Sequence, residues 1–218
     1  QQGKRQYLGA SRLGVSCERQ LQYEYAQAPV DPDKGFSGRI LRIFERGHRI
    51  EDAMVGWLRA AGFMLKTEGK DGQQFGFSVA EGKLQGHCDG VFVGGPEGFA
   101  YPALWECKAL GGKSWTDLAK KGLAASKPVY AAQVAIYQTY LGLFDNPAIF
   151  TAVNADSMEI YTELVPFDAA LAQKMSDRAV RVIQATEAGE LLPRSFAQAD
   201  HFECRFCSYA ERCWGGAS

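Results

Sequence analysis

The residue types best suited to chemistry in this sequence are two carboxylates and a lysine near its middle. Asp89 lies in the sequence GHCDG, and Glu106 follows 17 positions later in the sequence WECK, which ends at Lys108. Alternate side chains of a β-strand share one face, so Glu106 and Lys108 are predicted to point the same way, with Trp105 and Cys107 on the opposite face. The pattern therefore predicts a charged pair on an otherwise apolar strand.

Charged groups in such a place need partners, because burying an unpaired charge costs a large amount of free energy. A divalent cation held by Asp89 and Glu106 would be one such partner, and hard carboxylate oxygens suit Mg²⁺ or Mn²⁺. Lys108 would then orient or activate a water molecule, while the cation stabilises charge on a phosphate undergoing in-line displacement. The simpler alternative is a surface ion pair between Glu106 and Lys108, with Asp89 capping a turn.

Two helical segments carry further candidates. Gln133 and Tyr137 are four residues apart, so a helix would present their amide and phenol together toward the edge of a sheet. His48 lies between the apolar positions Phe44 and Met54 of an amphipathic helix, from which its imidazole can reach a metal. The alternatives are that Tyr137 is a core aromatic with a solvated hydroxyl and that His48 is an ordinary hydrogen-bonded side chain.

Hydrophobic periodicity predicts the elements that position these residues. Helices are expected over 11–25, 37–61, 128–143 and 168–188, and strands over 75–79, 84–93, 103–107, 148–154 and 158–165. A turn region rich in proline, aspartate and glycine separates the first two helices. This order predicts one α/β or α+β domain over residues 1–218, with a small mixed sheet flanked by helices.

Six of the candidates, taken together, match a known nuclease motif. In chain order they are His48, Asp89, Glu106, Lys108, Gln133 and Tyr137. With these residues, the segment from about 37 to 143 resembles the RecB-like branch of the PD-(D/E)XK nuclease superfamily. The resemblance implies a restriction-endonuclease-like core, over about 37–165, and a DNA nuclease of the two-metal type.

The same resemblance implies a role for each matching residue. The implied metal ligands are His48, Asp89, Glu106 and the backbone carbonyl of Cys107. Lys108 would assist the hydrolytic water, and Gln133 and Tyr137 would support the site and contact the DNA backbone. Cys88 stands where other members often have proline, and no role is assigned to His87 or Glu51.

A second constellation consists of cysteines. Three of the six lie near the end of the chain with C-x2-C-x5-C spacing, at Cys204, Cys207 and Cys213. Thiolates packed this closely indicate a metal site whose fourth ligand comes from elsewhere. Cys17 is the natural candidate, because Cys88 and Cys107 are expected in the strand core. Zinc held by the same four cysteines, zinc held by His201 and the three tail cysteines, and three reduced thiols without metal are the alternatives.

One distant cysteine followed by this tail resembles the iron–sulfur nucleases of the same branch. That group includes CRISPR-adaptation exonucleases, AddB-type nuclease domains and phage exonucleases. With it, the resemblance extends over nearly the whole chain and implies a [4Fe-4S] cluster. Such a cluster would be structural, because a link from Cys17 to the tail joins the N-terminal helix to the C-terminal end.

A lysine-rich segment follows Lys108 directly. Between Lys108 and Lys127 there are five lysines and one acid, a local charge of +4. The predicted DNA contacts are Lys113, Trp115, Lys120, Lys121 and Lys127, with the indole stacking on an unpaired base. Contacts to phosphates carry no sequence information, so little sequence preference is expected. The alternative is a solvated helix face.

The composition limits the class of protein. The formal net charge of −1 over 218 residues excludes a protein that is basic throughout. No apolar run is long enough for a transmembrane helix, no segment reads as a secretory signal, and no Walker A pattern occurs. We therefore expect a cytoplasmic protein that binds no membrane, and the resemblance implies a bacterial or phage-infected cell and DNA as the partner.

The expected function is a Mg²⁺- or Mn²⁺-dependent DNA exonuclease acting on single strands or ends, with a structural [4Fe-4S] cluster, in phage recombination or CRISPR adaptation. A homo-oligomer and a recombination or CRISPR partner protein are left open. One alternative is a DNA-binding or recombination accessory module that does not cut and has an iron–sulfur or zinc site. Another is a zinc-stabilised interaction domain.

Overall fold

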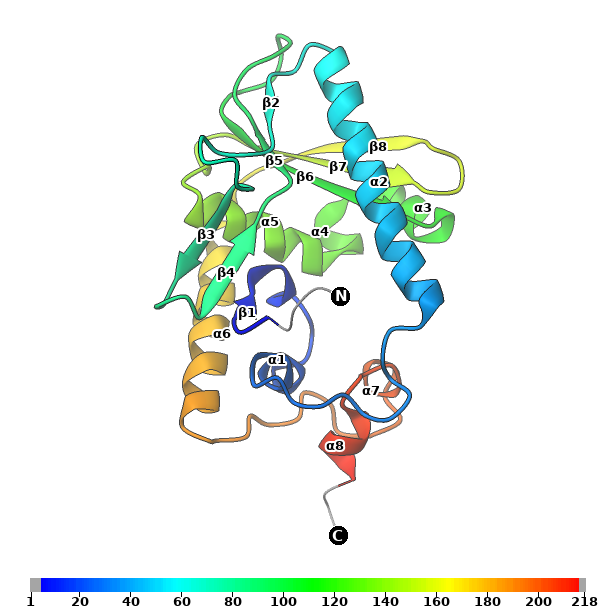
Figure 1. Cartoon of the computed structure of the whole chain (residues 1–218), viewed down its shortest axis with the longest axis vertical. Helices are drawn as coiled ribbons and strands as arrows, with labels where there is room; N and C mark the ends of the chain where they lie inside the picture. Colours follow the sequence, from blue (N-terminus) through cyan, green and yellow to red (C-terminus); the bar gives the residue numbers. More distant parts are fainter. Residues whose placement is uncertain (1–4, 216–218) are drawn as a thin grey trace.

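A five-stranded mixed sheet forms the centre of the fold in the computed structural model, which describes residues 5–215 (Figure 1). Its strands, in spatial order, are β2 (Leu65–Lys66), β5 (Gly90–Phe92), β6 (Ala103–Leu110), β7 (Ala148–Asn154) and β8 (Ile160–Val165). Strands β6 and β7 run parallel, and the other neighbours are antiparallel. A smaller sheet beside it has the order β1 (Leu8–Gly9), β4 (Leu84–His87) and β3 (Gly76–Val79).

The prediction of one strand over 84–93 is wrong, because the chain changes sheets at Cys88 and Asp89. β4 pairs with β3, whereas β5 begins at Gly90, opposite Trp105 of β6. At the break, the Asp89 carboxylate accepts a hydrogen bond of 2.7 Å from the backbone N–H of Cys107. A side chain thus binds an N–H of β6 directly beyond the β5 ladder, which holds Asp89 against the middle of β6.

The helices follow the predicted order, with additional short ones. They are η1 (Ala10–Arg12), α1 (Glu18–Tyr25), α2 (Gly38–Ala60), α3 (Gly112–Lys121), α4 (Leu123–Ser126), α5 (Pro128–Tyr140), α6 (Ala169–Glu187), α7 (Phe202–Arg205) and α8 (Ala210–Trp214). The Ser37 hydroxyl caps α2, the Asp168 carboxylate caps α6, and Pro128 occupies the first turn of α5, as sequence rules predict. The helix expected from residue 11 begins only at Glu18, because β1 and η1 precede it.

Two helices cover opposite faces of the large sheet. α5 lies on one face, and its residues 131–138 are all buried, because α6 and η1 pack on its outer side. α2 lies on the other face and buries only Ile50 and Met54 in a smaller core with Trp105 and Cys107. The N-terminal half of α2 extends past the sheet (Figure 1). None of the helices between residues 5 and 215 is long and apolar enough to cross a bilayer.

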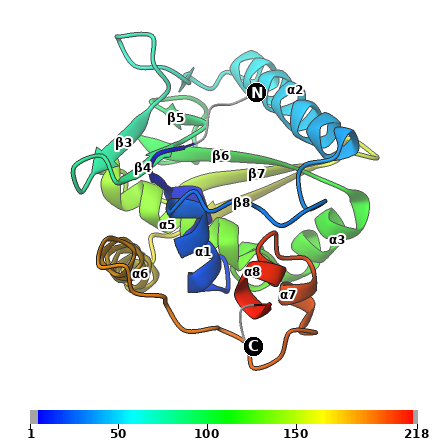
Figure 2. The ribbon, with the colours of Figure 1, turned by 60° about the horizontal axis from the view of Figure 1, so that its bottom comes forward.

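The C-terminal segment lies beside α1 and the linker that follows it (Figure 2). The buried Gln22 of α1 donates to the Glu190 carbonyl at 2.6 Å and accepts from the Leu192 N–H at 2.9 Å. The buried Asp31, in the linker between α1 and α2, accepts from the Glu211 N–H at 2.7 Å and from the Arg212 N–H at 3.2 Å. These contacts fix the segment that follows α6 against α1, and α8 against the linker.

Gly86 of β4 lies where the aromatic rings of the core leave no room for a side chain. A Cβ at this position would lie 2.7 Å from Tyr137 Cε1 and 2.8 Å from Phe77 Cε1. We expect Gly86→Ala to destabilise the protein by about 1–3 kcal/mol, because overpacking a core forces its side chains out of place. Each kcal/mol lowers Tm by about 2–4 °C in a domain of this size. The measurement is thermal unfolding by circular dichroism, beside Gly56→Ala, whose added Cβ would meet nothing within 4 Å. Equal Tm values for the two variants would contradict this account.

Candidate active site

Four of the predicted residues form one cluster of side chains. Glu106 is fully buried on β6, and its Oε2 accepts hydrogen bonds of 2.9 Å from Lys108 Nζ and of 2.9 Å from Gln133 Nε2 of α5. Lys108 Nζ also lies 3.7 Å from Asp89 Oδ2. The predicted alternation on β6 is confirmed, because Trp105 and Cys107 pack on the opposite face, in the core beneath α2.

Tyr137 lies one turn beyond Gln133 and is buried beside the cluster. Burial raises the pKa of its phenol, and the charge of Glu106 raises it further, although a hydrogen bond with Gln133 works in the opposite direction. The hydroxyl therefore stays protonated at neutral pH. Its ring packs edge-on against Phe77, with 5.9 Å between ring centroids. Tyr137 thus closes the core side of the cluster.

On helix α2, Glu51 faces the cluster more directly than His48 does. Burial and then the charge of Asp89 raise the pKa of Glu51 to about 7, while the charge of Lys108 acts in the opposite direction. His48, one turn earlier, is exposed and makes no side-chain hydrogen bond within residues 5–215. The sequence motif assigns no role to Glu51. Its spacing of three from His48, which places both on one flank of a helix, was the signal that could have identified it.

When ionised, the carboxylates of the cluster carry more negative charge than Lys108 compensates. Burial, followed by the charge of Asp89, raises the pKa of Glu106 to about 8 even though Lys108 is in contact with it. Burial alone would lower the pKa of Lys108, but Glu106 and Asp89 outweigh this effect and raise it well above that of a free lysine. The second oxygen of Glu106, Oε1, is buried and has no hydrogen-bond partner in the described part of the chain.

These residues fit a divalent cation by the chemistry of their donors. Carboxylate oxygens are the ligands that Mg²⁺ and Mn²⁺ prefer, and the unpartnered Oε1 of Glu106 gains a partner if a cation binds. As the side chains stand, no group of three or more His, Cys, Asp or Glu between residues 5 and 215 forms a coordination shell. The ammonium of Lys108 explains this at the cluster, because it lies between Glu106 and Asp89 and interacts with both.

An acidic groove opens beside the cluster, between α2 and the segment that leads into β3. Its carboxylates are Glu51, Asp52, Glu68 and Asp89, and Arg59 is its basic residue. Arg59 is engaged elsewhere, because its guanidinium donates two hydrogen bonds, of 3.1 and 3.0 Å, to the Leu65 carbonyl. A phosphate would be repelled from this groove unless cations were bound there.

The four predicted cysteine ligands come together from opposite ends of the chain. Cys17, Cys204, Cys207 and Cys213 line one pocket between α1, α7 and α8. Burial raises the pKa of Cys204 and of Cys207, and charge on the neighbouring thiols raises both further. This donor set fits a thiophilic metal or cluster, since binding deprotonates the thiols and compensates their charges. The sulfurs do not form a finished coordination shell within residues 5–215.

The position of His201 argues against the zinc alternative that includes it. Its ring stacks on Phe196 with 3.9 Å between centroids, and its Nδ1 accepts a hydrogen bond from the Glu203 N–H at 3.2 Å. His201 is not among the residues that line the cysteine pocket. The remaining two cysteines, Cys88 and Cys107, are buried in the core, as expected.

The predicted DNA contacts after β6 differ in how free they are to bind phosphate. Lys121 and Lys127 both pair with Asp117, at 2.7 and 3.4 Å. Lys113 and Lys120 are exposed and make no ion pair in the part of the chain that the structure describes. Trp115 packs on the core, and its indole N–H donates to the Ala152 carbonyl at 2.9 Å. Its ring therefore anchors α3 on β7, which leaves little of it for a base.

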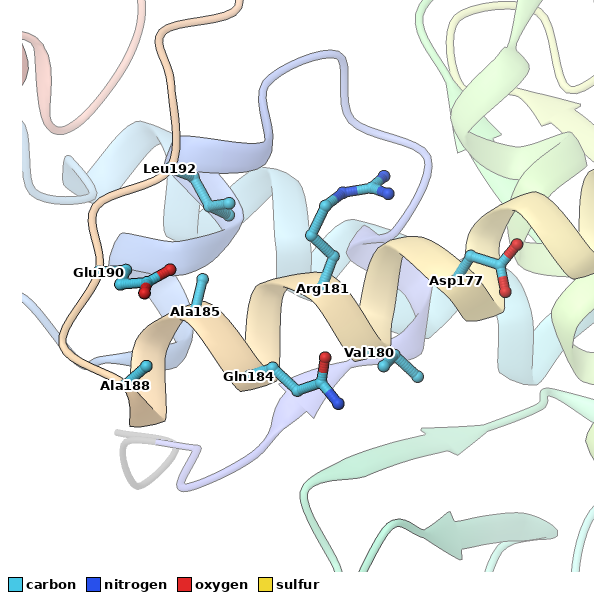
Figure 3. A pocket seen from close by; sticks show the side chains of 8 residues that line it. All are labelled: Asp177, Val180, Arg181, Gln184, Ala185, Ala188, Glu190 and Leu192. Carbon is cyan, nitrogen blue, oxygen red and sulfur yellow. The ribbon is translucent and has the colours of Figure 1, made fainter.

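A further pocket lies along α6, away from both clusters (Figure 3). Its lining residues are Asp177, Val180, Arg181, Gln184, Ala185, Ala188, Glu190 and Leu192. Arg181 is already paired with Glu18 of α1, at 2.7 Å. The pocket offers no converging set of catalytic groups, so the carboxylate cluster remains the candidate active site.

The fold is similar to that of a known exonuclease. An alkaline exonuclease, LHK-Exo from Laribacter hongkongensis, matches with a TM-score of 0.57 and 15% identity over 85% of this chain and 90% of that chain. LHK-Exo in complex with dAMP gives a TM-score of 0.53 and 16% identity over 84% and 89% of the chains. SSO0001 gives 0.52 and 17% over 100% and 90%. No known family model and no curated protein matches the sequence.

At such identities, the likeness shows a shared fold. The predicted mixed sheet with flanking helices is confirmed, and its arrangement is similar to the core of LHK-Exo. The names of these three structures do not refer to an iron–sulfur protein, so the iron–sulfur part of the prediction stays a prediction.

The raised pKa of Glu51 predicts a pH-dependent stability. The folded protein keeps the Glu51 proton up to a pKa of about 7, whereas the ordinary value is 4.5, so this contribution is complete below about pH 4.5 and is lost as the pH rises through 7. In EDTA, we expect Glu51→Gln to raise Tm at pH 8 by about 2–4 °C more than at pH 5.5, the shift that about 1 kcal/mol produces.

The control for this measurement is Glu45→Gln on the same helix. Glu45 is exposed and pairs with Arg49 at 2.9 Å, so its removal should change Tm little at either pH. If Glu51→Gln gives the same Tm difference from the unmodified protein at pH 5.5 and pH 8, Glu51 does not titrate as described.

Proposed function

We propose that the protein is a divalent-metal-dependent DNA exonuclease and that the carboxylate cluster is its active site. The observation that carries the proposal is the arrangement of Asp89, Glu106 and Lys108, in which the buried Oε1 of Glu106 has no hydrogen-bond partner among the described residues. The fold shared with LHK-Exo, an alkaline exonuclease that has been crystallised with the nucleotide dAMP, supports the same activity.

The chain's own residues divide the work of phosphodiester hydrolysis. Asp89 and Glu106 would hold the cation, joined by the Cys107 carbonyl and by Glu51 or His48 from α2. A bound Mg²⁺ or Mn²⁺ supplies Lewis-acid stabilisation of the charge that develops on the phosphate. Lys108 donates from Nζ and orients the attacking water, while Gln133 holds Glu106 Oε2 at 2.9 Å.

The substrate we propose is single-stranded DNA or a DNA end. The acidic groove beside Asp89 accepts a phosphate only together with cations, whereas the exposed Lys113 and Lys120 can bind phosphates without them. Backbone contacts of this kind act on any sequence. Trimming of DNA ends is a step that phage recombination and CRISPR adaptation would both use.

The second part of the proposal concerns the cysteine pocket. We propose that Cys17, Cys204, Cys207 and Cys213 bind a [4Fe-4S] cluster with a structural role, with zinc as the competing metal. The pocket supports it because it joins α1 to α7 and α8, and Cys213 already accepts a contact of 3.7 Å from Arg19 Nη1 of α1. A cluster there would tie together segments separated by almost the whole chain.

The nuclease proposal predicts metal-dependent loss of linear DNA that requires Glu106. The assay uses anaerobically purified protein with Mn²⁺ or Mg²⁺ on end-labelled single strands, linear duplex and closed circular single strands. Glu106→Gln and Lys108→Ala should lose cleavage by a factor of at least about 10², because each removes a group that acts on the reacting phosphate. Both variants should keep the fold and the colour of the protein.

Glu163→Gln is the matched control for this assay, because it removes a carboxylate of β8 that accepts from the Leu123 N–H at 2.8 Å and lies outside the cluster. It should retain cleavage. Sparing of circles with loss of linear strands identifies an exonuclease. If all DNAs survive while single strands are still bound, the protein is the non-cutting accessory module instead.

The cluster proposal predicts a brown protein with visible absorbance and about four irons per chain when purified without oxygen. Cys17→Ser should lose iron and colour and unfold at lower temperature, since the link between α1 and the tail is broken. Cys88→Ala, which removes a buried thiol outside the pocket, should keep the full iron content. A colourless, iron-free and zinc-loaded protein would refute the cluster and leave the nuclease proposal standing.

A further inference from the structure

Helix α2 changes character halfway along its length. Its first twelve residues carry four arginines and one glutamate, a net charge of +3 in a chain whose formal net charge is −1. The four arginines are Arg39, Arg42, Arg46 and Arg49. The half that follows begins with Ile50 and carries Glu51 and Asp52, both in the acidic groove. The basic half is therefore suited to phosphates and the acidic half to cations.

The basic half also exposes large apolar side chains next to the active site. Leu41, Phe44, His48 and Glu51 follow one another at steps of three and four residues, so they lie on one flank of α2. Leu41 and Phe44 are exposed, and Phe44 lies two helical turns, about 10 Å, before Glu51. Large apolar groups exposed together mark a binding surface.

Phe44 forms an aromatic pair at this surface. Phe36, which precedes the helix, packs edge-on against it with 5.1 Å between ring centroids and an interplanar angle of 84°. Phe36 is 70% exposed and Phe44 is 46% exposed, so the pair is not buried by the rest of the fold. Figure 1 shows this half of α2 standing clear of the sheet, on the side where the linker enters.

From this arrangement we infer that the pair Phe36 and Phe44 is a stacking platform for unpaired bases of single-stranded DNA approaching the carboxylate cluster. This inference rests on the proposed function, because it takes DNA to be the substrate. Arg39, Arg42 and Arg46 supply the positive charge that a phosphate backbone requires. The aromatic faces select single strands, because a duplex keeps its bases stacked on one another and offers only its edges and phosphates.

The platform predicts which substrate loses affinity when the ring is removed. Binding is measured by fluorescence anisotropy with a labelled oligo(dT) and with a duplex of the same length, in EDTA so that the DNA stays intact. Phe44→Leu keeps an apolar side chain but removes the ring, and should weaken oligo(dT) binding about 5- to 140-fold, the factor that corresponds to the loss of one stacked base. Duplex binding should change little. Phe44→Trp should keep the affinity, and oligo(dT) should quench its fluorescence.

Phe144→Leu is the matched control. Phe144 is 48% exposed and pairs with Phe167 at 5.8 Å, in the loop before β7, so it reproduces the exposure and the aromatic pairing of Phe44 at another place in the fold. It should bind both DNAs as the unmodified protein does. Equal loss for Phe44→Leu and Phe144→Leu would overturn the inference.

Two other results would also overturn the platform. The first is unchanged oligo(dT) binding by Phe44→Leu, and the second is an equal loss of single-strand and duplex binding. If the first result comes with a changed sedimentation coefficient of Phe44→Leu, the surface is a contact between copies of the chain. Because binding is measured without metal, the absence of cleavage would refute the proposed nuclease and leave this test unaffected.

Discussion

The burial of a carboxylate on a central strand is the constraint from which the rest of the site follows. Glu106 lies on β6, 1% exposed, where an unpaired charge would cost several kcal/mol. Lys108 and Gln133 share one of its oxygens, so α5 must lie on this face of the sheet at a fixed height. The same requirement explains Tyr137 behind Gln133 and the glycine at position 86, which makes room for the phenol ring. The positions of α5 and β4 on this face of the sheet are thus tied to the Glu106 side chain.

Helix α2 carries opposite charges on its two halves, and its position on the sheet is connected to the C-terminal tail. Helix α2 packs on the sheet with Ile50, Met54, Val55 and Leu58, all in or after its middle, so the placement of its first half depends on the linker that precedes it. That linker is held by Asp31, whose carboxylate accepts two N–H bonds at the start of α8. The cysteine pocket and the carboxylate cluster are therefore connected mechanically. The tail fixes the linker, the linker fixes the start of α2, and α2 carries Glu51.

Much of the fold and of the candidate site was predictable because the sequence signals are local. Alternation along β6 assigns Glu106 and Lys108 to one face, and a spacing of four residues assigns Gln133 and Tyr137 to one flank of α5. The tail spacing pointed to a shared cysteine pocket, and Cys17 joins it.

What the sequence could not reveal depends on partners far along the chain. Whether residues 84–93 join one sheet or two is decided by which strand they pair with, and the two-residue strands β1 and β2 exist only through such pairing. The choice between His48 and Glu51 depends on how α2 is rotated on the sheet, and the indole of Trp115 is occupied by a carbonyl of β7.

The contact between Asp31 and α8 also has a consequence for biosynthesis. Its partners are separated by 180 and 181 residues, so a chain still on the ribosome has made the linker long before it makes the segment that holds it. The sheet and α5 can assemble earlier, because their strands and helix come from the middle of the chain. The nascent protein would therefore assemble the sheet and α5 first and fix the helix that carries Glu51 last. Such an order delays completion of the carboxylate cluster until α8 has been synthesised.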